Sequence, residues 1–135
     1  MEISKLLTNV VTKNIVGPTS NNIQKVCIDS RLVDAGSLFV AVNGTQTDGH
    51  QYIVQAIKQG ARGILCEVLP ETLNPEVSYI EVSHSEDALG LIAANFYDNP
   101  STKLKLVGIT GTNGKTTVAT ILYEAFRKLG YKAGL

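Results

Sequence analysis

Apolar residues are distributed along the chain in two kinds of run, which predict two kinds of element. In the first kind, apolar residues follow one another almost without interruption over four to six positions. Runs of this type, bounded by turn-forming residues, are typical of strands that are buried in a parallel sheet. They predict strands over residues 26–30, 37–42, 63–68 and 79–82.

In the second kind of run, apolar residues recur with a 3.6-residue period, which predicts amphipathic helices. The first lies at the N-terminus, the second ends at Gly60, and the third follows the last strand. Asp48 with Gln51, and Ser83 with Glu86, have the spacing of capping boxes at the starts of the second and third helices. The three apolar faces consist of Ile3, Leu6, Leu7 and Val10, of Tyr52, Ile53, Ala56 and Ile57, and of Leu89, Ile92, Ala93 and Phe96.

The alternation of strands and helices indicates an α/β fold with a mainly parallel sheet. Asn99-Pro100-Ser101 interrupts the chain after the third helix and reads as a hinge. We therefore expect a small α/β domain over residues 1–100 and the beginning of a second domain over residues 101–135. Because a crossover helix needs a return strand, we expect this second domain to be incomplete in the chain.

The most informative stretch is LKLVGITGTNGKTT, at residues 104–117. Its apolar start predicts a buried strand over residues 104–109. Glycines then permit a tight turn, and a helix with an apolar face begins at Lys115 and ends at Gly130. The apolar face of this helix is formed by Val118, Ile121, Leu122, Ala125 and Leu129.

A strand, a glycine-rich turn and a helix that opens with Gly-Lys-Thr are the context of a phosphate-binding loop. The lysine reaches the outer phosphates of a bound nucleotide, and the hydroxyl that follows it binds Mg²⁺. The pattern departs from the general P-loop because Ile109 stands where the first glycine belongs. The sequence therefore predicts a variant P-loop that uses ATP and Mg²⁺, with Lys115 as the catalytic residue and Thr116 as the metal ligand.

Composition limits the other possibilities. The chain has 135 residues, 44% hydrophobic content and no net charge, so no excess of charge favours a nucleic acid or a membrane surface as partner. No apolar run is long enough to cross a bilayer, and the N-terminus lacks the features of a signal peptide. Cys27 and Cys66 lie within apolar runs, which indicates reduced core thiols in a cytoplasmic protein. His50 and His84 are isolated, and neither is expected to be catalytic.

Several sequence motifs together resemble those of the Mur ligase family. TGTNGKTT is the family's ATP-binding segment, and Asp29-Ser30-Arg31, LFVAVNG at 38–44 and DGHQYI at 48–53 occur in the order and spacing of its uridine-nucleotide-binding domain. The resemblance covers essentially the whole chain. It implies a small N-terminal α/β domain that binds a UDP-linked substrate, followed by a P-loop ATPase domain.

The resemblance also implies site residues. Apart from the resemblance, the residue types and spacing favour a local ion pair of Asp29 with Arg31 that orders their turn, and a helix cap rather than a ligand at Asp48. The uracil end of the substrate is expected at Ile28 and Ser30, and its diphosphate at Thr45, Gln46 and Thr47. The ATP-binding residues are expected to be Gly111, Thr112, Asn113, Gly114, Lys115, Thr116 and Thr117.

The activity implied is a step in the synthesis of peptidoglycan precursors for the bacterial cell wall. ATP would activate the carboxylate of UDP-N-acetylmuramoyl-L-alanyl-D-glutamate as an acyl phosphate, and the amine of meso-diaminopimelate or L-lysine would displace the phosphate. The chain alone is expected to be inactive. Alternatives that stay open are a non-catalytic UDP-sugar-binding module, the ligase that completes the UDP-N-acetylmuramoyl-pentapeptide, and another ATP-using enzyme such as a folylpolyglutamate synthetase-like ligase or a kinase.

Overall fold

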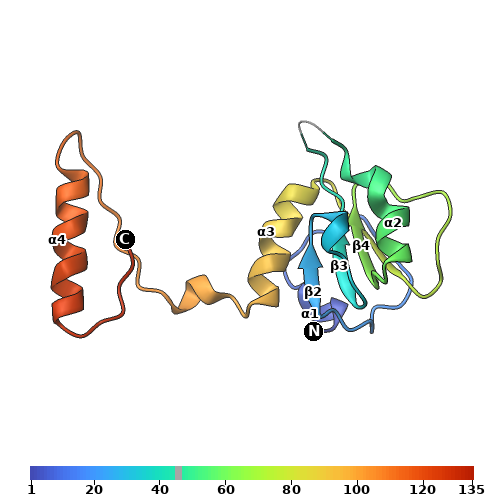
Figure 1. Ribbon diagram of the computed structural model, residues 1–135, viewed down its shortest axis with the longest axis horizontal. Coiled ribbons are helices and arrows are strands. Elements are labelled where there is room, and N and C mark those ends of the chain that lie inside the picture. The colour runs from blue at the N-terminus through green and yellow to red at the C-terminus, as the bar shows by residue number, and fades with distance from the viewer. Residues whose placement is uncertain (45–46) are drawn as a thin grey trace. The chain divides into compact units, whose positions relative to one another are not determined.

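A computed structural model describes residues 1–44 and 47–135 of the chain. The structure consists of two compact units, residues 1–103 and residues 104–135, and each is described by itself (Figure 1). Among the described residues, no helix is both long enough and apolar enough to span a membrane.

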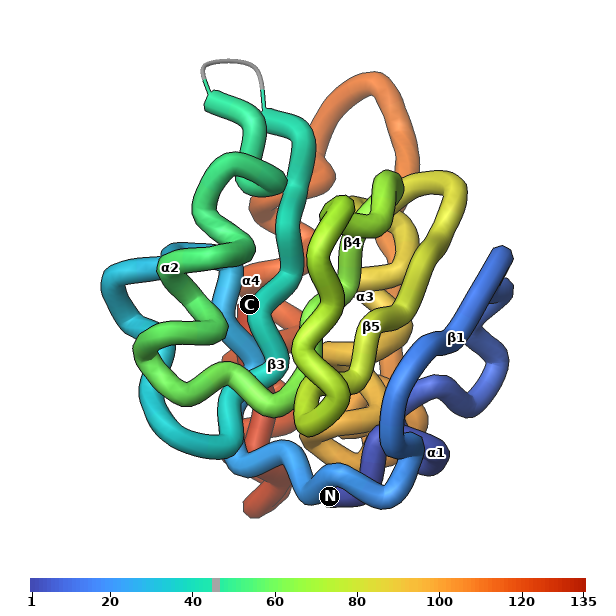
Figure 2. The backbone as a smooth tube through the Cα atoms, turned by 90° about the vertical axis from the view of Figure 1, so that its right-hand side faces the viewer, coloured from blue at the N-terminus to red at the C-terminus, as the bar shows by residue number. Residues whose placement is uncertain are grey.

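The first unit is built on one five-stranded sheet with the strand order β1-β5-β4-β3-β2. Strands β2 to β5 are parallel to one another, and β1 pairs with β5 in the antiparallel sense. Figure 2 shows β1 at the edge of the sheet, beside β5. The strands are β1 (Asn14–Val16), β2 (Lys25–Cys27), β3 (Ser37–Val40), β4 (Gly63–Cys66) and β5 (Ser78–Glu81).

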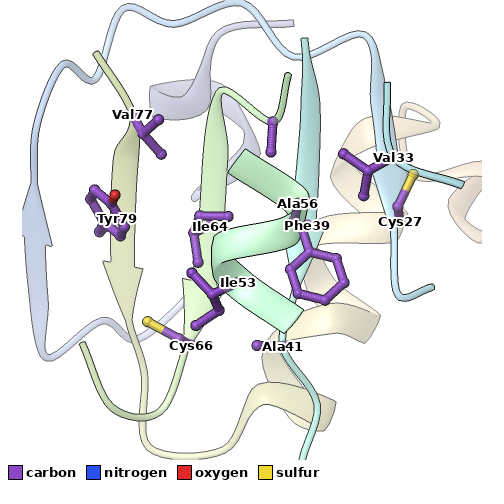
Figure 3. Packing of buried hydrophobic residues seen from close by; sticks show 11 residues of the cluster. Cys27, Val33, Phe39, Ala41, Ile53, Ala56, Ile64, Cys66, Val77 and Tyr79 are labelled. Carbon is purple, nitrogen blue, oxygen red and sulfur yellow. The ribbon is translucent and has the colours of Figure 1, made fainter. Parts of the chain in front are cut away.

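Helices cover both faces of this sheet, so the unit has two apolar cores. Helix α2 (Ile53–Lys58) packs on one face, where Phe39, Ile64 and Tyr79 are almost fully buried (Figure 3). Helices α1 (Ile3–Leu6) and α3 (Ser85–Phe96) pack on the other face. That second core consists of Ile3, Leu6, Ile23, Leu38, Val40, Leu65, Ile80, Val82, Ala88 and Ile92.

The α/β class, the mainly parallel sheet and the four predicted strands are confirmed, although β2, β3 and β4 are shorter than predicted and β5 begins and ends one residue earlier. Strand β1 was missed. It has only three residues, of which two are exposed, so its sequence carries no apolar run or clear alternation. The strand forms because β5 offers it a partner at the edge of the sheet, where Ile15 pairs with Ile80. Cys27 and Cys66 are free, buried thiols, as predicted, and burial raises the pKa of Cys66 to about 12.

The predicted helices are present, but the two capping boxes are not. The Asp48 carboxylate does cap a helix, but it accepts from the backbone N–H of His50 and begins a 3-10 turn, η2 (Gly49–Tyr52), before α2. Helix α3 begins at Ser85 with no cap from a side chain of its own N-cap residue. Its first N–H donates instead to Glu67, at 2.8 Å, because the end of β4 brings that carboxylate to the helix.

The second unit contains one long helix, α4 (Lys115–Lys128). The residue predicted to stop it, Gly130, follows its C-cap residue and has φ +86°. The strand predicted over residues 104–109 is wrong for this chain. Residues 104–114 form no regular element, and Leu106 is 85% exposed. A strand forms its hydrogen bonds with neighbouring strands, and none pairs with this segment among the described residues. The expected hinge is a short 3-10 turn, η3 (Pro100–Lys103), that follows two residues with positive φ, Asp98 and Asn99.

Candidate functional site

The carboxyl ends of β2 to β5 lie along one edge of the sheet because these four strands are parallel. Open α/β sheets bind their ligands at this edge. The described segments that leave it are residues 28–32 after β2, residues 41–44 and 47–48 after β3, Glu67 after β4 and residues 82–85 after β5. A polar hollow of about 300 Å³ lies here, lined by Asn43, Glu67, His84, Glu86 and Asp87.

The segment after β2 presents an apolar side chain beside a buried polar one. Ile28 is 62% exposed, whereas Ser30 is buried and begins a 3-10 turn, η1 (Ser30–Leu32). The Asp29 carboxylate caps this turn by accepting from the backbone N–H of Arg31 at 2.9 Å. The Arg31 guanidinium donates to the same carboxylate, at 2.7 Å from its closest nitrogen, and its hydrogen bonds lower the pKa of Asp29 to about 2. The local ion pair expected from the sequence is confirmed.

The segment after β3 turns back on itself before η2. The backbone N–H of Gly44 donates to the carbonyl of Thr47, and that of Gly49 donates to the carbonyl of Val42. Asn43 and Asp48 form an isolated antiparallel bridge between the two arms of the turn. Of the residues predicted to contact the diphosphate, Thr47 is exposed, while Thr45 and Gln46 lie outside the residues that the structure describes.

A hydrogen-bonded chain of side chains follows this turn, and sequence reasoning missed it. The His50 ring bonds to the Asp48 carboxylate through Nδ1, at 2.6 Å, and accepts from the backbone N–H of Glu67 through Nε2, at 2.9 Å. The Glu67 carboxylate accepts from the N–H and the hydroxyl of Ser85. The only sequence signal was an acidic residue at the end of the apolar run 63–68, because the histidine partner lies 17 positions away.

The glycine-rich segment of the second unit forms a turn that leads into α4. Gly114 has φ +76° immediately before the helix, a conformation that favours glycine. It is the N-cap residue and provides no side-chain cap, so the first N–H groups of α4 have no side-chain partner from the N-cap. The Lys115 ammonium donates to the carbonyl of Gly111 at 2.6 Å. The seven residues expected to bind ATP therefore surround the N-terminus of one helix, where backbone N–H groups favour anions.

Comparison with known proteins shows the family of the chain. The model of the Mur ligase family, catalytic domain, matches residues 22–97, which is more than half of the chain. The chain belongs to the Mur ligase family. The resemblance that the sequence motifs indicated is thereby confirmed.

Individual relatives match over the whole chain. The chain is 53% identical over 135 residues to the UDP-N-acetylmuramoyl-L-alanyl-D-glutamate–2,6-diaminopimelate ligase of Phocaeicola vulgatus, and 55% identical to that of Bacteroides fragilis. In both cases the match covers 100% of this chain and 28% of the relative. The chain thus spans little more than a quarter of the length of these curated relatives.

Solved structures support the fold. The UDP-N-acetylmuramoylalanyl-D-glutamyl-2,6-diaminopimelate–D-alanyl-D-alanyl ligase of Acinetobacter baumannii matches 95% of this chain and 28% of its own, with a TM-score of 0.59 and 22% identity. The MurF ligase of Thermotoga maritima, solved in complex with ADP, matches 80% of this chain and 24% of its own, with a TM-score of 0.53 and 30% identity.

Proposed function

We propose that the protein to which this chain belongs is an ATP-dependent ligase of peptidoglycan synthesis. It joins 2,6-diaminopimelate to UDP-N-acetylmuramoyl-L-alanyl-D-glutamate in the cytoplasm. The observation that carries the proposal is the identity of 53% over all 135 residues to a relative with that name. The names of the relatives favour diaminopimelate over lysine as the amino acid that is added.

Within this proposal, the first unit binds the UDP end of the substrate at the carboxyl edge of its sheet. The exposed side chain of Ile28 provides an apolar surface for the uracil ring, and Ser30 provides polar groups beside it. Thr45, Gln46 and Thr47 contact the diphosphate through neutral hydrogen bonds. The bidentate pair of Asp29 and Arg31 fixes the turn that carries Ser30, so we assign these two residues a supporting role.

The second unit supplies the phosphate-binding loop for ATP. A carboxylate is a poor acyl donor, so it first takes the γ-phosphoryl group of ATP to form an acyl phosphate, and the incoming amine then displaces phosphate. The N–H groups of residues 113–117 hold the phosphates. Lys115 exchanges its contact with the Gly111 carbonyl for the phosphoryl oxygens and offsets their charge.

A divalent cation fits the first turn of α4. The chain offers a hydroxyl at Thr116, directly after the lysine, and hard oxygen ligands of this kind suit Mg²⁺. When bound, Mg²⁺ would neutralise charge on the phosphates. The residues of this chain would position the nucleotide around it.

The test is turnover of the complete protein with ATP, the UDP-linked dipeptide and diaminopimelate. We expect release of ADP and phosphate that depends on both other substrates, and Lys115→Ala should reduce kcat by at least about a hundredfold. Binding of the UDP-linked substrate should be unchanged in that variant. Lys128→Ala, at the far end of the same helix, is the matched control. Near-normal turnover of Lys115→Ala would refute the role of the loop, and lack of any ligation would refute the proposed reaction.

A further inference from the structure

We propose that His50 is a positioning residue for the substrate's diphosphate, because its imidazole fastens the turn after β3 to the end of β4. The inference rests on the proposed function, and among the residues predicted to contact the diphosphate it concerns Thr47, which the structure describes. His50 does not touch the substrate in this account. It acts through the backbone of the turn that does.

The turn leaves the sheet where the regular pairing of β3 with β4 stops. Among the described residues, the last backbone hydrogen bond from the β3 side to β4 is that of the Ala41 N–H, which donates to the carbonyl of Leu65 at 2.8 Å. The backbone hydrogen bonds that follow, from Gly44 to Thr47 and from Gly49 to Val42, lie within the turn. They shape the turn, but neither of them reaches β4.

His50 supplies a hydrogen-bonded connection from the turn to β4. Its side chain is only 17% exposed and makes two hydrogen bonds on opposite sides of the ring. Nδ1 lies 2.6 Å from the Asp48 carboxylate, which belongs to the turn, and Nε2 lies 2.9 Å from the backbone nitrogen of Glu67, at the end of β4. The ring therefore bridges the segments that follow two neighbouring strands.

The partners of the ring determine where its proton lies. The backbone N–H of Glu67 is a donor, so Nε2 must accept and carries no hydrogen. The proton of the neutral ring is then on Nδ1, where it is donated to the Asp48 carboxylate. The ring is therefore a donor towards Asp48 and an acceptor from Glu67.

The far side of the bridge is itself anchored. The Glu67 carboxylate accepts from the backbone N–H of Ser85 at 2.8 Å and from its hydroxyl at 2.9 Å. Ser85 is fully buried and is the first residue of α3. The turn is thus connected through His50 and Glu67 to the start of the longest helix of the first unit, which is a rigid support for a binding segment.

Two substitutions separate the halves of the bridge. In His50→Gln, the side-chain carbonyl reaches the place of Nε2 and can still accept from Glu67. In His50→Asn, the shorter amide reaches the place of Nδ1 and can still donate to Asp48, but the contact with β4 is lost. The proposal requires the contact with β4, so glutamine should preserve binding of the substrate and asparagine should not.

The experiment measures the affinity of the 135-residue chain for UDP-N-acetylmuramoyl-L-alanyl-D-glutamate by calorimetry. We expect His50→Asn to bind between about tenfold and a hundredfold more weakly than the wild type, the cost of a misplaced binding segment. The affinity of His50→Gln should stay within about threefold of the wild-type affinity, which is clearly less than a tenfold loss. Gln55→Asn, which shortens an exposed side chain of α2 away from this edge, is the control and should bind as the wild type does.

A second measurement keeps the inference testable if an asparagine variant fails to fold. Nitrogen chemical shifts of the imidazole in the wild-type chain report the tautomer directly, and we expect a neutral ring protonated on Nδ1. A ring protonated on Nε2 overturns the inference. So does a folded His50→Asn chain that binds as tightly as the wild type, whereas a wild-type chain that does not bind at all overturns the proposed function of the first unit.

Discussion

The two units of this chain make different use of similar apolar sequences. In the first unit, the strand residues Phe39 and Ile64 are completely buried between the sheet and α2 (Figure 3). In the second, Leu106 and Val107 belong to an equally apolar run but are 85% and 61% exposed. The first run is a strand because it has neighbours with which to pair, and the second is not.

Helices follow a different rule, as α4 demonstrates. It spans 14 residues although none of them is buried. A helix satisfies its backbone N–H and C=O groups within its own segment, whereas a strand depends on another segment for every one. In the second unit the local sequence is therefore sufficient for the helix, whereas the apolar run before it would need neighbouring strands to become a strand.

The largest expected effect on stability comes from truncating one apolar side chain of each unit to alanine. Ile64→Ala removes a fully buried side chain and should lower the free energy of unfolding by about 2–5 kcal/mol. Leu106→Ala removes an exposed side chain and should change it by no more than about 0.5 kcal/mol. Urea unfolding followed by far-ultraviolet circular dichroism measures both. A large loss from Leu106→Ala would mean that the second unit has a core after all.

Two glycine substitutions in the first unit are expected to change the stability of the fold in opposite directions. A Cβ on Gly49 would lie 2.8 Å from the backbone nitrogen and oxygen of Val42, so Gly49→Ala should destabilise the fold by roughly 1–3 kcal/mol. Gly90 lies within α3, and a Cβ there would meet nothing within 4 Å. Gly90→Ala should stabilise by roughly 0.5–1 kcal/mol. Thermal unfolding of both variants tests the pair, and equal shifts would contradict the packing of the turn.

A smaller effect is expected in the response to acid. In the folded chain the pKa of Glu67 lies below its ordinary value, mainly because its carboxylate accepts the backbone hydrogen bond from Ser85. Stability from the ionised carboxylate is therefore complete above the ordinary glutamate pKa. It is lost as the pH falls through that value towards the lower pKa of the folded state.

Glu67→Gln should reduce this acid-dependent loss, seen as a flatter plot of unfolding free energy against pH below the ordinary glutamate range. Glu71→Gln, at an exposed position in the loop before β5, is the control and should leave the slope unchanged. An unchanged slope in Glu67→Gln would mean that the carboxylate does not cap α3.

Sequence reasoning found the elements that carry their own pattern. It located β3, β4, α2 and α3 because their apolar residues recur with the period of a strand or a helix. It missed β1 and the cap of α3 because each depends on a partner brought near only by folding, Ile80 in the first case and Glu67 in the second.

The same distinction applies to the candidate site. The motif at residues 29–31 was visible because Asp29 and Arg31 are two positions apart, and their ion pair forms within the turn. Asp48 and His50 are also two positions apart, but the contact of His50 with Glu67 was not visible, since it joins the ends of two strands. Residues that act through distant partners therefore need the fold before they can be recognised.

The central claim is that the first unit binds the UDP end of the substrate at the carboxyl edge of its sheet. The most direct test is a pair of titrations of the 135-residue chain followed by backbone amide NMR, one with UDP-N-acetylmuramoyl-L-alanyl-D-glutamate and one with Mg-ATP. The account predicts that the UDP-linked ligand shifts the amides of residues 28–30 and 45–47 and leaves residues 111–117 unchanged. A UDP-linked ligand that leaves residues 28–30 and 45–47 unshifted, while Mg-ATP shifts residues 111–117, would contradict it.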